Sequence, residues 1–200
     1  MKPVLVVDNY DSFVYNLVHL VRELDGVEPV VRRNDKLTVA EASSFERILL
    51  SPGPGIPQEA GVMPAIVRDL GGTHRILGVC LGHQCIGEVY GATLENMADV
   101  CHGKGVATTV LETDEPLFSG VLSPFLSGRY HSWVVSPCGF PDCLAITATD
   151  DEGRIMALRH RIFDVRGVQF HPESVLTPEG RGIVENWVKG HPATTGVLKG

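Results

Sequence analysis

The sequence has 200 residues, of which 44% are hydrophobic and 20% charged, which suffices for one ordinary globular domain with a substantial core. These proportions exclude disordered, collagenous and disulfide-scaffold proteins. The net charge of -7 and the pI near 5.6 argue against a basic surface for nucleic acid, so we expect no nucleic-acid partner. The apolar runs are far shorter than the ~20 residues that cross a bilayer, so we expect no membrane partner.

Cysteine content and the N-terminal segment predict the compartment. The apolar block after Pro3 ends at Asp8, too early for the core of a secretory signal peptide. We therefore expect a cytoplasmic protein. Its five cysteines, an odd number, favour free thiols, one of them reactive, over a disulfide framework.

Short apolar runs alternate with segments of helical periodicity in the first half of the chain, a pattern typical of parallel βαβ units. Strands are predicted at residues 4–7, 27–31, 47–50 and 75–79, and helices at 13–21, 38–45, 62–70 and 81–90. In the second half, β-like runs at 106–111, 128–135, 144–148, 155–160 and 167–170 indicate antiparallel or mixed additions, and a last helix is predicted at 178–189. The predicted fold is an open, mostly parallel mixed α/β sheet flanked by helices. It forms one domain over residues 1–190, followed by a flexible tail at 191–200.

A cysteine stands where a predicted strand gives way to a helix, in the run GVCLG at residues 78–82. Glycines two residues to either side permit the tight turn of a nucleophile elbow, which lifts the side chain above the sheet. The helix N-terminus favours the thiolate, which is the attacking species. Cys80 is therefore the candidate nucleophile, against the alternative of a buried structural cysteine.

A cysteine nucleophile needs a base, and His171 is the candidate among eight histidines. It lies at a predicted strand end, precedes a proline, and has Glu173 two positions later. In an extended segment these two side chains leave the backbone on the same side, so the carboxylate can orient the imidazole. The pattern predicts a Cys-His-Glu triad assembled in space.

An acyl-transfer site also needs donors for an oxyanion. The N–H of Leu81, next after the nucleophile, is one candidate, and the loop SPGPG at 51–55 is the other, with an ordinary connecting loop as its alternative. The cysteines and histidines at positions 80, 83, 85, 101 and 102 lack the paired spacing of a zinc site, so we expect no metal.

Taken together, the sequence blocks resemble a known family. The blocks are DNYDSF at 8–13, SPGPG at 51–55, GVCLGHQ at 78–84, HGK at 102–104, RYHS at 129–132 and FHPES at 170–174. In this order they resemble the class I (triad) glutamine amidotransferases, which have a flavodoxin-like fold. Within that class they are similar to the glutaminase component of anthranilate synthase or aminodeoxychorismate synthase. The likeness extends from residue 4 to about residue 187.

The resemblance implies that L-glutamine is hydrolysed through a γ-glutamyl thioester on Cys80, without a cofactor. His171 would be the base and later the acid, and Glu173 would orient it. The ammonia would pass to a chorismate-utilising synthase subunit, because a chain of this length has no room for the acceptor chemistry. Three alternatives remain open: another acceptor or a secondary-metabolite pathway, a non-catalytic regulatory subunit, and a hydrolase of γ-glutamyl peptides.

The resemblance also implies the residues that hold glutamine. They are Gly53, Pro54, Gly55, Leu81, Gln84, Ser132 and the backbone of Trp133, with the N–H groups of Gly53 and Leu81 as the oxyanion hole. Trp133 stands where many relatives have leucine, and Cys85 stands where alanine is usual. We expect Cys85, beside the site, to compete with Cys80 for thiol reagents. Residues 8–13 and 102–104 are expected near the glutamine site or facing the synthase, although Asp11 has a helix cap as its alternative role.

Overall fold

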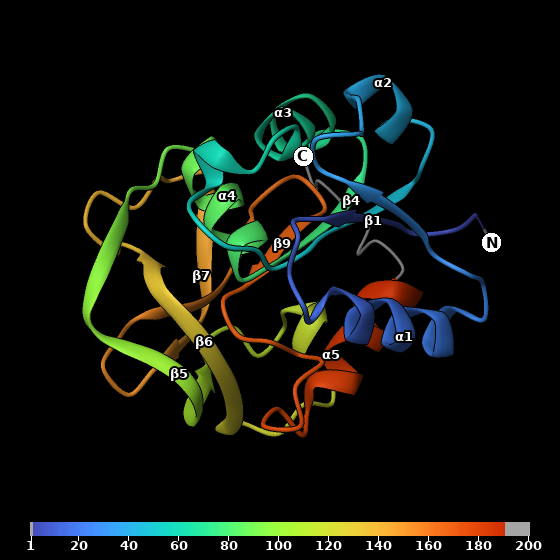
Figure 1. Ribbon diagram of the computed structural model, residues 1–200. Coiled ribbons are helices and arrows are strands. Elements are labelled where there is room, and N and C mark those ends of the chain that lie inside the picture. The colour runs from blue at the N-terminus through green and yellow to red at the C-terminus, as the bar shows by residue number, and fades with distance from the viewer. Residues whose placement is uncertain (1, 191–200) are drawn as a thin grey trace, which may run out of the picture.

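The computed structural model describes residues 2–190, apart from the side chains of residues 98–102 (Figure 1). The expected flexible tail at 191–200 lies outside the described residues. The strands are β1 (Leu5–Asp8), β2 (Val30–Arg33), β3 (Arg47–Leu50), β4 (Arg75–Val79), β5 (Leu94–Val110), β6 (Phe125–Val135), β7 (Leu144–Asp150), β8 (Ile155–His160) and β9 (Val165–Val168). The α-helices are α1 (Val14–Asp25), α2 (Val39–Ala42), α3 (Met63–Leu70), α4 (Leu81–Val89) and α5 (Gly180–Lys189), with 3-10 turns η1 (Pro57–Glu59) and η2 (Pro116–Phe118). Within residues 2–190, none of these helices has the length and apolar character needed to span a membrane.

These strands form a nine-stranded sheet in the order β2-β1-β3-β4-β9-β8-β7-β5-β6. The first five in this order run parallel, and the rest add antiparallel pairs. Because β2 and β3 lie on opposite sides of β1, the strand order reverses there, and open α/β sheets bind ligands outside the carboxyl ends of their strands at such a point. The predicted open, mostly parallel mixed sheet is confirmed.

Helices cover both faces of the parallel part of the sheet (Figure 1). Alternate residues of β1 point to opposite faces: Val6 belongs to an apolar cluster under α1 and α5, and Leu5 and Val7 belong to one under α3 and α4. Strands buried on both sides are continuous apolar runs, as the sequence shows. The layers hold the carboxyl ends of the parallel strands in fixed positions.

The start of α1 shows what Asp11 does. Its Oδ1 accepts a hydrogen bond from the N–H of Phe13 at 2.7 Å, two residues later, which is the pattern of an Asx turn. The helix ends at Gly26, whose φ of 69° is the left-handed conformation that glycine adopts without strain. Asp11 thus closes a turn just before α1, and the N-cap residue of the helix, Phe13, is not itself capped by a side chain, so the helix-cap alternative for Asp11 is wrong.

Several predicted strands have other bounds in the structure, as β2, predicted at 27–31, shows, and β5 differs most. β5 begins at Leu94, not at residue 106, and pairs with β6 through two register irregularities. The residues before 106 are rich in polar groups and glycine, so their strand state comes from pairing with β6 and not from local pattern. The run predicted at 167–170 is β9, which is parallel to β4 and antiparallel to β8 and so joins the two halves of the sheet.

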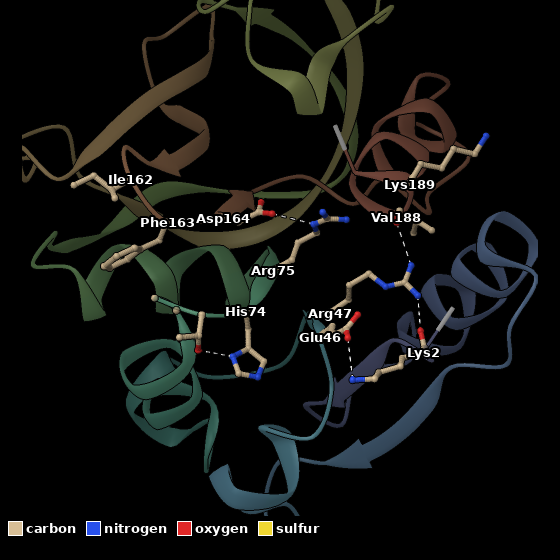
Figure 2. A pocket seen from close by; sticks show the side chains of 13 residues that line it. Lys2, Glu46, Arg47, His74, Arg75, Ile162, Phe163, Asp164, Val188 and Lys189 are labelled. Atoms are coloured by element: carbon tan, nitrogen blue, oxygen red, sulfur yellow. Dashed lines mark hydrogen bonds and ion pairs between the residues drawn. The ribbon is translucent and has the colours of Figure 1, made fainter. Parts of the chain in front are cut away.

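A buried ion pair ties the amino-terminal edge of the sheet together. Arg47, at the start of β3, donates to both carboxylate oxygens of Asp25 at 2.7 and 2.9 Å. The same guanidinium donates to the carbonyls of Lys2 and Val188 (Figure 2). The side chains are 8% and 0% exposed, so the pair joins α1, β3 and α5 away from water.

We expect Asp25→Ala to lower the free energy of unfolding by about 3–5 kcal/mol, because it leaves a buried guanidinium without its carboxylate. Urea denaturation measures this. The control is Glu46→Ala, which removes the exposed pair Lys2–Glu46 and should cost at most about 0.5 kcal/mol. Equal losses in the two variants would contradict the assignment.

Candidate active site

Cys80 occupies a strained turn between β4 and α4. Its φ of 53° and ψ of -100° lie in a region where residues other than glycine are rarely found. The turn is held by the Cys80 N–H, which donates to the Val168 carbonyl at 2.9 Å, and by the Cys80 carbonyl, which accepts from the Gln84 N–H at 3.0 Å. The predicted strand-turn-helix elbow is confirmed, and strain of this kind is typical of functional sites.

The elbow glycines are required by close backbone packing. A Cβ on Gly78 would lie 2.4 Å from the carbonyl carbon of Gly82, and a Cβ on Gly82 would lie 2.5 Å from the carbonyl oxygen of Leu50. Both distances are below any ordinary contact, so each position excludes a side chain. The two glycines let the turn sit directly against β3.

His171 and Glu173 form a buried pair, as predicted, but through a different backbone. The His171 Nδ1–H donates to Glu173 Oε1 at 2.7 Å, and the two side chains are 2% and 1% exposed. The backbone here is a turn, in which the Ser174 N–H donates to the His171 carbonyl at 3.2 Å, and not the expected extended segment. The predicted contact between His171 and Glu173 is confirmed, but the extended backbone that was expected to produce it is wrong.

The surroundings of His171 favour its charged form. Burial alone would lower its pKa, but interactions with Cys80 and Glu173 outweigh burial and raise the pKa to about 10. The rings of Phe13 and Tyr130 pack edge-on against the imidazole, with centroids 5.3 and 4.9 Å away. The direction of this shift favours the imidazolium form of His171, beside the sulfur of Cys80.

The glycine-rich loop after β3 reaches the start of α4. A Cβ on Gly53 would lie 2.8 Å from Leu81 Cδ2 and 2.5 Å from Asn9 Cβ, so its backbone is pressed against both residues. Asn9, after β1, holds this loop: its N–H donates to Ser51 Oγ at 3.0 Å and its Nδ2 to the Ser51 carbonyl at 2.8 Å. Leu81 is the first residue of α4, so its N–H has no acceptor within the helix. The loop that carries Gly53 therefore lies against Leu81, and the role of the two N–H groups as oxyanion donors stays a prediction.

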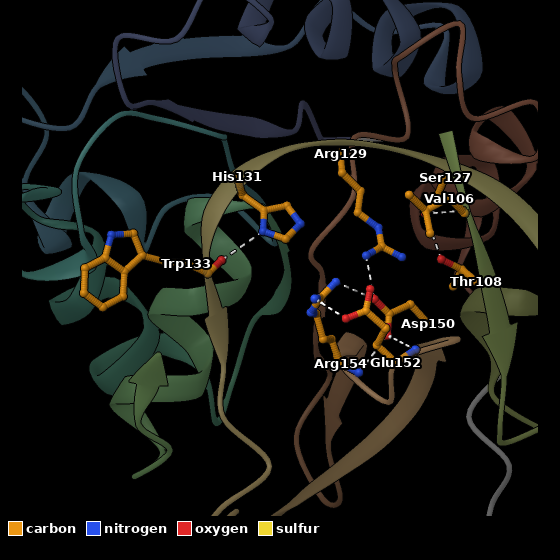
Figure 3. A network of polar contacts seen from close by, with 9 residues as sticks. All are labelled: Val106, Thr108, Ser127, Arg129, His131, Trp133, Asp150, Glu152 and Arg154. Carbon is orange, nitrogen blue, oxygen red and sulfur yellow. Dashed lines mark hydrogen bonds and ion pairs between the residues drawn. The ribbon is translucent and has the colours of Figure 1, made fainter. Parts of the chain in front are cut away.

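Gln84 belongs to a buried hydrogen-bond network. Its Nε2 donates to the Trp133 carbonyl at 2.8 Å and to Gln169 Oε1 at 3.2 Å. The Trp133 carbonyl also accepts from His131 Nδ1 at 3.0 Å (Figure 3). Gln169 in turn donates from Nε2 to Cys80 Sγ at 3.6 Å. Sequence reasoning assigned no role to Gln169, and its position directly before the FHPES block was the only available signal.

The remaining predicted residues line the opening of the site or lie apart from it. Pro54 and Gly55 are exposed on the loop, and Ser132 is half-buried on β6, on the face that also carries Tyr130. Lys104 is exposed, and the side chains of Cys101 and His102 lie outside the described residues. Among the residues described, no group of three His, Cys, Asp or Glu side chains is arranged to hold a metal.

Cys85 does not behave as expected. It lies on α4 with 0% exposure, within the apolar cluster under α3 and α4. Burial, assisted by the charge of Glu88, raises the pKa of its thiol. The residue is adjacent in sequence but points into the core, so the expectation of a second reactive thiol at the site was wrong. The exposed free thiols of the described chain are Cys138 and Cys143.

The cavity of about 600 Å³ at the amino-terminal edge of the sheet contains none of the candidate residues (Figure 2). Its charged groups are largely paired with one another, as in Lys2–Glu46 and Arg75–Asp164, both at 2.9 Å. It is a crevice between packed elements and not the active site.

The fold and the site together define an open α/β protein with a cysteine elbow and a buried histidine-carboxylate pair at the carboxyl edge of its sheet. A family model described as "Glutamine amidotransferase class-I" matches residues 5–190. The chain therefore belongs to the class I glutamine amidotransferases, and the resemblance seen in the sequence is confirmed.

Three known proteins illustrate the relationship. The chain is 46% identical to aminodeoxychorismate synthase component 2 of Klebsiella aerogenes, covering 92% of this chain and 98% of the relative. It is 48% identical to chloroplastic anthranilate synthase beta subunit 2 of Oryza sativa subsp. japonica, covering 94% of this chain and 71% of the relative. A solved structure described as a GMP synthase subunit from Thermoplasma acidophilum superposes with a TM-score of 0.84 at 25% identity, covering 94% and 93%.

We expect His171 to titrate well above the ordinary histidine value of about 6.5 and to be protonated at pH 7. Glu173→Gln should lower its midpoint, because it removes a negative charge that favours the imidazolium. Carbon-detected NMR of labelled histidine measures both midpoints. Glu185→Gln, the same change on the exposed side of α5, is the control and should leave His171 unaffected. A wild-type midpoint at or below 6.5 contradicts the assignment.

Iodoacetamide should label Cys138 and Cys143 in the native protein, while Cys85 should react at least ~100-fold more slowly, because it is buried and neutral. Peptide mass spectrometry after timed labelling measures each rate. Labelling in urea is the control, since all thiols become accessible there. Native labelling of Cys85 at the rate of Cys138 would show that it is not enclosed.

Proposed function

We propose that the chain hydrolyses L-glutamine to glutamate and ammonia at Cys80 and delivers the ammonia to a synthase subunit that aminates chorismate. The observation that carries the proposal is the buried His171–Glu173 pair beside a cysteine in a strained elbow. The names of the relatives support the acceptor, since one is a component of aminodeoxychorismate synthase and another belongs to anthranilate synthase.

The proposed reaction has two steps. The Cys80 sulfur attacks the carboxamide carbon of glutamine, and the oxyanion accepts hydrogen bonds from the N–H groups of Leu81 and Gly53. His171 gives its proton to the leaving nitrogen, so ammonia departs and a γ-glutamyl thioester remains on Cys80. His171, now neutral, takes a proton from water as the water attacks the thioester carbon. Glutamate leaves, and the thiolate and the imidazolium are restored.

The hydrogen-bond network restricts how glutamine is bound. Both amide hydrogens of Gln84 are already used, so this side chain can offer only its Oε1, an acceptor for the α-ammonium of glutamine. The Trp133 carbonyl already accepts two hydrogen bonds, so its contribution to binding would come from its N–H. The Ser132 hydroxyl and the loop of Gly53, Pro54 and Gly55 would complete the pocket.

The surface beside the site suits a partner. Tyr10 is 50% exposed and Val175, two residues after Glu173, is 95% exposed. Apolar side chains at the opening of a site favour docking of another subunit, which would also shield the ammonia from bulk water. We propose that residues 1–190 act as one glutamine amidotransferase domain in such a hetero-oligomer. The reactive thiol suits the reducing conditions of the cytoplasm.

Cys80→Ala should lower glutamine-dependent product formation at least ~1,000-fold, because no other group can form the thioester. The partner's activity with ammonium salts should persist. The assay uses the complex with a synthase partner that makes anthranilate and, in a separate reaction, with one that makes aminodeoxychorismate, each supplied with chorismate. Cys138→Ala, an exposed cysteine, is the control. Glutamine-dependent activity in the Cys80→Ala complex would overturn the proposal.

A further inference from the structure

One side of the Cys80 sulfur faces a buried amide. Gln169 Nε2 donates to Sγ at 3.6 Å, a normal length for a hydrogen bond to sulfur, and the Gln169 side chain is fully enclosed. The residue is anchored by its backbone N–H, which donates to the Met156 carbonyl at 2.8 Å and so continues the pairing of β8 with β9. This donor is separate from His171, which approaches the sulfur from the turn after β9.

The orientation of this amide is fixed by its neighbours. Gln84 Nε2 has two hydrogens, one bound to the Trp133 carbonyl and one to Gln169 Oε1. Since Gln84 offers a hydrogen to Gln169, the Gln169 oxygen must face Gln84 and its nitrogen must face the sulfur. Turning Gln84 over would bring its Oε1 against the Trp133 carbonyl, which can only accept, so the orientation of Gln84 is fixed as well. The network therefore presents a donor, never an acceptor, to Cys80.

We propose that Gln169 is a further catalytic residue, whose amide N–H stabilises the thiolate of Cys80 before attack and again when the thioester is hydrolysed. Gln84 acts as a positioning residue by holding that amide. This inference rests on the proposed role of Cys80 as the nucleophile. A neutral donor suits the role because it favours the anionic sulfur without giving up a proton to it, so the proton for the leaving ammonia still comes from His171.

The arrangement separates two tasks at one sulfur atom. His171 transfers protons, and Glu173 holds it in place for that task. Gln169 contributes a fixed dipole, which needs no reorganisation as charge moves from the sulfur to the substrate oxygen and back. His171, with Glu173 behind it, interacts with Cys80, and a change at Gln169 replaces neither of them.

The test is the pH dependence of iodoacetamide alkylation at Cys80 in the isolated full-length chain, followed by peptide mass spectrometry. Gln169→Met keeps the length of the side chain and removes the donor. Gln169→Leu is likewise uncharged and lacks the donor. We expect the midpoint of the alkylation profile to rise by about one pH unit or more in both variants, the effect of losing one hydrogen bond to a charged group. Gln58→Met, an exposed glutamine, is the control and should leave the midpoint unchanged.

A purely structural role for Gln169 predicts lower thermal stability with an unchanged alkylation midpoint, and that result would overturn the inference. If Gln169→Met fails to fold, Gln169→Leu, which is also uncharged and lacks the donor, decides the question by the same profile. Alkylation requires neither glutamine nor a synthase partner, so its outcome is independent of the proposed function, which stands or falls with the glutamine-dependent activity of Cys80→Ala. In the complex, Gln169→Met should lower kcat about tenfold or more with little change in KM for glutamine.

Discussion

The close packing of backbone at the elbow is the constraint on which the site depends. Gly78 lies against Gly82, and Gly82 lies against Leu50 of β3, at distances that exclude a Cβ. This packing forces Cys80 into a conformation that costs about 1–3 kcal/mol and is kept only because the surrounding structure determines it. Strand β3, which is buried throughout, and the buried residues 76–79 of β4 hold the turn in this conformation. The strain places the sulfur above the sheet edge, with the unpaired N–H groups of α4 beneath it.

Parallel strands bring the rest of the site to the same edge. Asn9 follows β1, Ser51 follows β3, Cys80 follows β4 and Gln169 follows β9, so four separate segments meet because their strands are neighbours in the sheet. Side-chain amides then connect these ends, Asn9 to Ser51 and Gln84 to Gln169. Buried amides with satisfied hydrogen bonds fix a single arrangement, because any rotation would leave a polar group unpaired in the interior. The sheet determines the approximate positions of the site residues, and the hydrogen-bonded amides determine the orientations of their side chains.

A feature of the fold or the site could be predicted from the sequence when the contacts that produce it join residues close together in the chain. The elbow was predictable, because its glycines and the strand-to-helix change lie within five consecutive residues. The start of β5 at Leu94 was not, since it depends on pairing with β6 and not on its own residues. The partners of Gln169 are Gln84 and Cys80, which are 85 and 89 positions away, so no spacing rule could connect them. The His171–Glu173 contact was predicted, although the turn that makes it was not.

The buried histidines show why residue type alone does not identify the base. Burial lowers the pKa of His83 to about 3, and burial with the nearby charge of Arg129 lowers that of His131 to about 4. His171 is as enclosed as these two, yet its pKa is raised, because it has Glu173 and Cys80 as partners. The interactions with Cys80 and with the Glu173 carboxylate therefore favour the proton on His171 and not on the other two imidazoles. Neutral His131 can then donate from Nδ1 to the Trp133 carbonyl and support the amide network, while the proton needed by the leaving ammonia stays on the ring beside the sulfur.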